Sequence, residues 1–182
     1  MDTDVEVVKS LDPLRVYDAV SGYESQTHIQ TGTMGACRDN EWIGMLLHNY
    51  DHRHFLRKNG TYDTTTNVVV ITDLTVKKYG LHLHGQKLVF GHNMVLLPFD
   101  YLCAKDLDTG EICKTFNTYT IHHFAASWFS EDERNYSRLY KKYDAEFRRN
   151  RMNPKLSHYA SRIRAAYEIG GISMIFRRLF ID

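Results

Sequence analysis

Cysteine, proline and long apolar runs are all scarce in this 182-residue sequence. The three cysteines, Cys37, Cys103 and Cys113, are odd in number and form no Cys-x-x-Cys pair, which argues against a disulfide framework and a zinc ribbon. No segment approaches the roughly 20 consecutive apolar residues of a membrane-spanning helix, and the acidic start is unlike a secretory signal. These absences predict a cytoplasmic protein with reduced cysteines.

The composition that is present is that of a globular protein. Hydrophobic residues make up 43% of the chain and charged residues 25%. Aromatic residues are plentiful, with 12 Tyr and 9 Phe, which suits a protein that stacks against rings or lies at an interface. A chain of this length is expected to form one domain with a substantial core.

Charge is unevenly distributed along the chain. Residues 1–133 contain 11 Lys/Arg and 18 Asp/Glu, whereas residues 134–178 contain 12 Lys/Arg and 3 Asp/Glu. Such a split is typical of contact with a polyanion, either a nucleic acid or an anionic membrane surface. Because no nucleic-acid-binding motif accompanies the basic segment, we expect no nucleic-acid partner.

Sequence patterns predict both strands and helices in the first 130 residues. Short strands are expected after the acidic start and over 17–23, 81–97 and 118–123. A helix is expected over 39–57, capped by Asp39 or Asn40. A polar turn at 106–111 predicts a hairpin that joins strands at 101–103 and 112–113.

Two further segments are predicted to be helical. The β-branched run 68–74 has strand propensity, but possible capping residues at 63–66 and a closing Gly80 favour a helix. The tail over 131–168 is expected to be helical, with Ser130 as its N-cap and Asn153-Pro154 dividing it into two helices.

The first candidate site residues are Asp2 and Asp4, which stand directly before the first expected strand. Side chains two residues apart in an extended strand point to the same side, so both carboxylates can face one cation. Mg²⁺ or Mn²⁺ takes such oxygen ligands, and phosphate groups of a substrate often complete the shell. A solvated acidic terminus is the alternative for this pair.

The second candidate cluster is the segment His122-His123-Phe124-Ala125-Ala126-Ser127-Trp128. Adjacent histidines in a strand point to opposite sides, so at most one is expected to join a given site. Ser127 can bind a metal or phosphate oxygen, and Trp128 can donate a hydrogen bond or stack on a ring. Packed histidines and a core tryptophan are the alternative.

The order and separation of six short segments resemble glycosyltransferase family 32 over roughly residues 1–130. These segments are Asp2-Thr3-Asp4-Val5-Glu6, Gly22-Tyr23-Glu24, Gln30-Thr31-Gly32, Thr66-Asn67-Val68-Val69, Thr118-Tyr119-Thr120-Ile121-His122-His123 and Ala126-Ser127-Trp128. The resemblance implies an α/β GT-A fold, a nucleotide-sugar donor, a divalent metal held by a DXD motif, and retention of anomeric configuration.

The resemblance also implies a role for each candidate residue. Asp2 and Asp4 match the DXD pair. His122 or His123, with Ser127, falls where the family closes the metal and diphosphate site, and Trp128 matches a residue that contacts the nucleotide diphosphate. The remaining candidates match motifs around the sugar and acceptor pocket: Gln30 and Thr31 as donor-binding residues, and Glu24 and Asn67 as catalytic candidates that stabilise positive charge on the sugar.

The implied function is transfer of a hexose from a nucleotide sugar to a glycan or lipid-linked glycan acceptor in cell-surface polysaccharide synthesis. In the family, further strands precede the DXD motif, so this chain is expected to be a partial GT-A domain over 1–130 followed by a basic helical tail over 131–182. A truncated gene or a misassigned start would have the same effect. The alternative function is that of a non-catalytic remnant acting as a binding or regulatory fragment.

The end of the tail predicts a surface helix. One helical face would carry the apolar residues Ile172, Ile175, Phe176, Leu179 and Phe180 beside basic residues. Such a helix can lie on an anionic membrane, which would make the protein peripheral at the inner face of the membrane. Docking onto another domain or a partner is the alternative.

Overall fold

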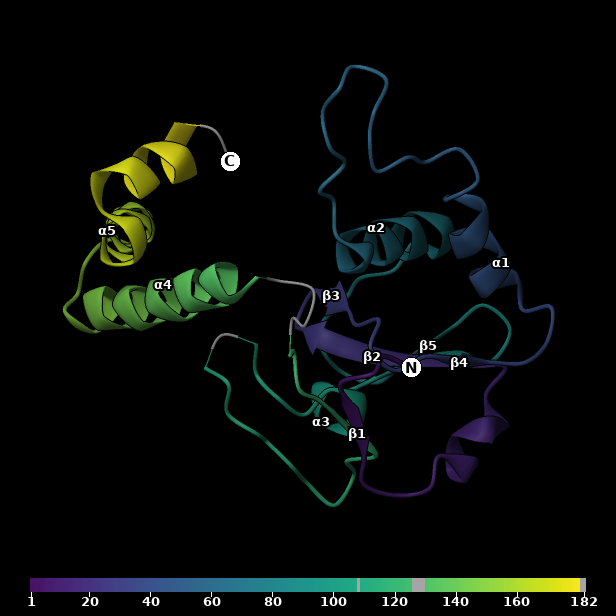
Figure 1. Ribbon diagram of the computed structural model, residues 1–182. Coiled ribbons are helices and arrows are strands. Elements are labelled where there is room, and N and C mark those ends of the chain that lie inside the picture. The colour runs from purple at the N-terminus through teal and green to yellow at the C-terminus, as the bar shows by residue number, and fades with distance from the viewer. Residues whose placement is uncertain (108, 126–129, 181–182) are drawn as a thin grey trace. The chain divides into compact units, whose positions relative to one another are not determined.

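The chain folds into two units, residues 1–124 and 125–182 (Figure 1). The computed structural model describes residues 1–107, 109–125 and 130–180. In these ranges no helix is both long and apolar enough to cross a membrane.

The first unit is built on a five-stranded mixed sheet in the order β3-β2-β6-β5, with β4 paired to the same edge of β2 as β3. β2 runs parallel to β6, whereas its pairings with β3 and β4 and the β5–β6 pairing are antiparallel. The elements before and within this sheet are β1 (Val5–Val7), the 3-10 helix η1 (Asp12–Val16), β2 (Ala19–Ser25), β3 (His28–Ile29), β4 (Gly35–Ala36), α1 (Glu41–His48), α2 (Asn67–Tyr79), β5 (Leu88–Phe90) and β6 (Met94–Leu97). The elements after it in this unit are α3 (Phe99–Leu102) and β7 (Thr120–His122).

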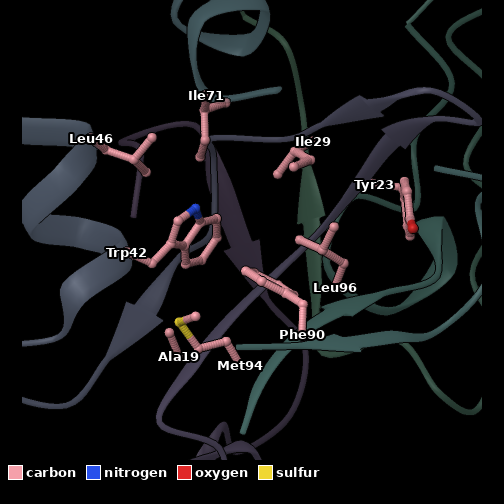
Figure 2. Close-up of a cluster of buried hydrophobic side chains, with 9 residues drawn as sticks. All are labelled: Ala19, Tyr23, Ile29, Trp42, Leu46, Ile71, Phe90, Met94 and Leu96. Atoms are coloured by element: carbon pink, nitrogen blue, oxygen red, sulfur yellow. The ribbon is translucent and has the colours of Figure 1, made fainter. Parts of the chain in front are cut away.

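One face of the sheet packs against α1 and α2 (Figure 1). Figure 2 shows this core, in which the indole of Trp42 meets the ring of Phe90 edge-on at a centroid distance of 5.3 Å. The buried Trp42 Nε1 donates to Thr75 Oγ1 at 2.8 Å, so its polar atom is satisfied inside the core. The other members of the core are Ala19, Tyr23, Ile29, Leu46, Ile71, Met94 and Leu96.

The opposite face of the sheet carries a smaller apolar cluster. Val20, Val95 and Leu97 alternate along β2 and β6 with the residues of the first core, as expected for strands buried on both faces. Leu14 from η1 and Leu102 from α3 complete the cluster. β1 and β7 form a separate antiparallel pair.

The helix predicted for the run 68–74, with Gly80 closing it, is confirmed as α2 (Asn67–Tyr79). The Thr66 side chain accepts a hydrogen bond from the backbone N–H of Val69, and Gly80 ends the helix in the left-handed region at φ 62°. These caps and the burial of one face outweigh the strand propensity of the β-branched run.

Two other predictions were wrong in their extent or type. The helix expected over 39–57 is capped by Asn40 but ends at His48, because successive turns follow from Asn49 to Arg53. The hairpin expected around 106–111 retains only an isolated antiparallel bridge between Lys105 and Ile112. Its predicted first strand is instead the end of α3 and the residue that follows it.

The second unit is a pair of helices, α4 (Glu131–Arg149) and α5 (Pro154–Phe180). Ser130 and Glu133 form a complete capping box, which confirms Ser130 as the N-cap. The break predicted at Asn153-Pro154 separates the helices. A second break falls at Gly170 and Gly171, where the backbone of α5 leaves helical geometry.

Candidate metal site

Pairing of β1 with β7 joins the two ends of the first unit at one point. Val5 lies opposite His122 in the antiparallel register, and the backbone N–H of His123 donates to the carbonyl of Asp4 at 2.9 Å. Asp2 and Asp4 precede β1 and His122 ends β7, so the pairing brings two carboxylates to one imidazole.

The three side chains form one potential metal-binding group. One ligand atom from each of Asp2, Asp4 and His122 lies within 4.8 Å of the others. His122 Nε2 is 3.4 Å from Asp4 Oδ1 and 3.9 Å from Asp2 Oδ2. The sequence predicted Asp2, Asp4 and one of His122 and His123 for this group, and it is His122 that lies with the carboxylates.

His122 is held in a tight, buried position. The residue is 7% exposed, and its ring packs on Phe124 at a centroid distance of 4.1 Å. Gly32 lies against the other edge of the ring, where a Cβ atom would fall 2.7 Å from Nδ1. Only a residue without a side chain fits at position 32 while the imidazole keeps this position.

Burial also sets the protonation of this histidine. Desolvation lowers the pKa of His122, although the nearby Asp4 and Asp2 act in the opposite direction. The neutral form is therefore favoured, and a neutral imidazole offers a lone pair to a metal. Its buried Nδ1 has no hydrogen-bond partner among the described residues, a partner that metal-bound histidines usually have.

The loop at 30–33 links the site to the central sheet. The backbone N–H of Asp2 donates to the Gly32 carbonyl at 2.8 Å. Thr33 Oγ1 lies 3.1 Å from Thr120 Oγ1 on β7, so consecutive residues of the loop contact the segment before β1 and β7 itself. Gly32 was noted in a motif, but its contact with His122 and the part played by Thr33 and Thr120 were missed, because no sequence signal marks such non-local packing.

Gln30, predicted to bind the donor, supports this loop from within. The residue is fully buried, its Nε2 donates to the Thr33 carbonyl at 2.8 Å, and its Oε1 accepts from the Thr33 N–H at 3.1 Å. These bonds occupy both ends of its amide group. In this structure Gln30 therefore acts on the site through the loop.

Thr31 and Asn67 are brought together. Asn67 Nδ2, at the start of α2, donates to Thr31 Oγ1 at 3.0 Å. Thr31 belongs to the loop that holds Gly32, and Asn67, which is exposed, contacts this loop through that bond. The structure thus places two of the predicted pocket residues beside each other, next to the loop that contacts His122.

Glu24 lies near the end of β2 and is half-buried. Burial raises the pKa of Glu24, and the nearby His28 partly offsets this. The pKa of the Cys103 thiol is raised to about 12, mainly by burial and further by the nearby negative charge of Glu24. Because the Cys103 carbonyl accepts from the His122 N–H at 2.8 Å, Glu24 belongs to the region around β7.

The other predicted residues lie elsewhere or outside the described ranges. His123 Nε2 is 2.9 Å from Glu6 Oε2, on the opposite side of the β1–β7 pair from the carboxylates of the site. Ser127 and Trp128 fall outside the residues that the structure describes.

The donor set is compatible with a divalent cation. Two ligand atoms on opposite sides of an ion, with bonds of about 2.1 Å, are about 4.2 Å apart. The ligand atoms here lie within 4.8 Å of one another, so they would have to move closer together by less than about 1 Å to bind one ion. Carboxylate oxygens suit Mg²⁺ and Mn²⁺, whereas an imidazole nitrogen suits transition ions better than Mg²⁺. The donor types therefore match Mn²⁺ better than Mg²⁺, whereas the distances do not discriminate between the two ions.

Comparison with known protein families, with curated proteins and with solved structures gives no match for this chain. The case for a function therefore depends on the arrangement of the residues themselves.

Proposed function

We propose that this chain is a metal-dependent, retaining glycosyltransferase with a GT-A type of fold. It would move a hexose from a nucleotide sugar to a glycan or lipid-linked glycan acceptor in cell-surface polysaccharide synthesis. The observation that carries the proposal is the convergence of Asp2, Asp4 and His122 from opposite ends of the first unit. The parallel β2–β6 pair covered by α1 and α2 is compatible with the proposed fold.

The proposed role of the three side chains is to hold Mn²⁺ at the diphosphate of the donor. When bound, the ion stabilises the negative charge that develops on the departing nucleoside diphosphate. Burial keeps His122 neutral, so the imidazole contributes a lone pair and no competing positive charge. The 30–33 loop fixes the ring through Gly32 and fixes the start of the chain through Asp2.

Two further residues are suited to the sugar side of the reaction. Asn67 presents its amide at the start of α2, where its oxygen accepts from the Val68 N–H at 3.0 Å and keeps a second lone pair for the positive charge that develops on the sugar ring. Glu24 can stabilise the same charge when ionised. The raised pKa of its carboxyl predicts that this contribution falls as the pH drops toward mildly acidic values.

Release of nucleoside diphosphate from a panel of UDP- and GDP-sugars tests the proposal. With Mn²⁺ present, we expect the full chain to release nucleoside diphosphate from at least one donor, and chelation to stop the release. Asp4→Asn should lower the rate at least about 100-fold, because a metal ligand is lost.

Glu6→Gln is the matched control for this experiment. Glu6 lies on the strand that follows Asp4 but faces His123, so its loss should leave the rate within about twofold. Saturable Mn²⁺ binding with no release from any donor would contradict the transferase and support a non-catalytic binding fragment.

A further inference from the structure

The outer face of α5 carries a stripe of exposed apolar side chains. Leu156, Tyr159, Ile163 and Tyr167 are 63%, 57%, 42% and 61% exposed. Their spacing of three or four residues places all four on one side of a helix, within about 80° of arc. We call these four residues the α5 stripe.

The α5 stripe faces away from α4. Ser157, Ser161 and Ala165 are fully buried and recur every four residues on a different side of α5. Ser157 Oγ donates to Asp144 Oδ1 at 2.5 Å, which identifies this small-residue side as the contact with α4. Small residues allow the two helices to approach closely, so the larger apolar residues are left on the outside of the pair.

The helix pair that carries the stripe is basic, with 12 Lys/Arg and 6 Asp/Glu over residues 131–180. Three of the acidic residues lie in the first turn of α4. The other three contact partners inside the helix pair, since Asp144 meets Arg148, Glu146 meets Arg164 and Glu168 accepts from the Tyr143 hydroxyl. Lys155 and Arg151 are exposed at the end of the helix pair where the stripe begins.

The part of α5 after the glycine break continues the same combination. Ile172 and Phe176 are exposed and lie one helical turn apart, and Arg177 follows directly. Gly170 and Gly171 interrupt the helix at φ/ψ values outside the helical region. The break gives this short segment a direction of its own relative to the stripe.

We propose that the α5 stripe is a docking surface for an anionic lipid bilayer. Tyrosine, isoleucine and leucine side chains enter the boundary between headgroups and acyl chains, while the surrounding Lys and Arg contact anionic headgroups. Charge complementarity selects this occupant, because an apolar stripe on a helix pair with an excess of Lys and Arg fits a surface that is both apolar and anionic. This surface acts independently of the proposed metal site.

Co-sedimentation of the full chain with vesicles tests the proposal. We expect binding to vesicles of phosphatidylglycerol mixed with phosphatidylcholine, and at least about tenfold weaker partitioning onto phosphatidylcholine alone. Raising the salt concentration from about 0.1 M to about 0.5 M should weaken binding, since headgroup attraction is screened. Ile163→Asp should weaken partitioning at least about tenfold, because it removes an inserted side chain and adds a negative charge.

Ala145→Asp is the matched control, since it adds the same charge to an exposed position of α4 outside the stripe. It should weaken binding much less than Ile163→Asp, and circular dichroism should show unchanged helix content for both variants. Equal binding by wild type and Ile163→Asp would overturn the proposal. Failure to bind anionic vesicles, with retention on single-stranded RNA or with dimerisation through the stripe, would also overturn it.

Discussion

The two units are stabilised by contacts of different range. In the first unit, the β1–β7 pairing joins residues from the two ends of the unit, and the Glu6–His123 contact spans 117 positions. In the second unit, α4 and α5 are joined by a short turn and meet through small side chains and side-chain hydrogen bonds. The first arrangement can assemble a site from distant residues, whereas the second produces a surface whose character follows from helical spacing.

The largest expected effect is loss of the first core through Trp42→Ala. Removing the buried indole should lower the free energy of unfolding of the first unit by about 3–5 kcal/mol. Trp42→Phe is the control, because it keeps a ring against Phe90 and loses the bond to Thr75 and part of the indole volume, at a smaller cost of about 1–3 kcal/mol. Hydrogen exchange over residues 19–97 measures both. Equal losses in the two variants would argue against the packing shown in Figure 2.

Overpacking of the helix pair is the corresponding change in the second unit. Ala165→Leu places a larger side chain on the buried side of α5, and we expect a loss of about 1–3 kcal/mol. Ala145→Leu adds the same atoms at an exposed position and should change the unfolding free energy by less than about 0.5 kcal/mol. Denaturant unfolding followed by helix content compares them, and similar values would mean that Ala165 does not lie in the contact.

A smaller effect on Mn²⁺ binding is expected from a substitution in the 30–33 loop, which lies between the central sheet and the metal site. Gly32→Ala should displace the His122 ring and weaken Mn²⁺ binding about tenfold, as changes beside a metal ligand commonly do. Gly44→Ala adds a methyl group where no atom lies within 4 Å, so it should leave Mn²⁺ affinity unchanged. Titration calorimetry distinguishes the outcomes, and unchanged affinity in Gly32→Ala would remove Gly32 from the site.

The smallest expected effect concerns pH. Since the folded state lowers the pKa of His122, the unfolded chain binds this proton more readily. The contribution of His122 to stability is therefore present above the unfolded value of about 6.5 and is lost as the pH falls below it. Mn²⁺ affinity should decline in the same direction, because the ion competes with the proton. His122→Asn should flatten the part of the profile below pH ~6.5, and an unaltered profile would assign the titration to another group.

Local features of the fold were predictable from the sequence. The caps of α2 and α4, the break at Pro154 and the opposite orientations of His122 and His123 all follow from residues close in sequence. The early end of α1 and the short helix α3 did not follow, because turn geometry and packing against the sheet outweighed periodicity there. These two errors lie next to loops, where local propensity is weakest as a guide.

The sequence indicates candidate residues for the site but not their arrangement. Asp2 and Asp4 were predicted from residue type and spacing, and either His122 or His123 from the resemblance, whereas the pairing that brings His122 to the carboxylates is long-range. Gln30 is an example of what the sequence does not indicate. Its side-chain amide forms two hydrogen bonds to the backbone of Thr33 in the same loop, and no local pattern predicts them. Burial of a polar side chain with internal partners is a property of the folded chain.

Electron paramagnetic resonance of Mn²⁺ added to the full chain tests the central claim most directly. We expect one bound ion per chain for wild type and for Glu6→Gln, and loss of this ion in Asp4→Asn and in His122→Ala. Retention of the bound ion in Asp4→Asn, or absence of saturable Mn²⁺ binding in the folded wild type, would contradict it.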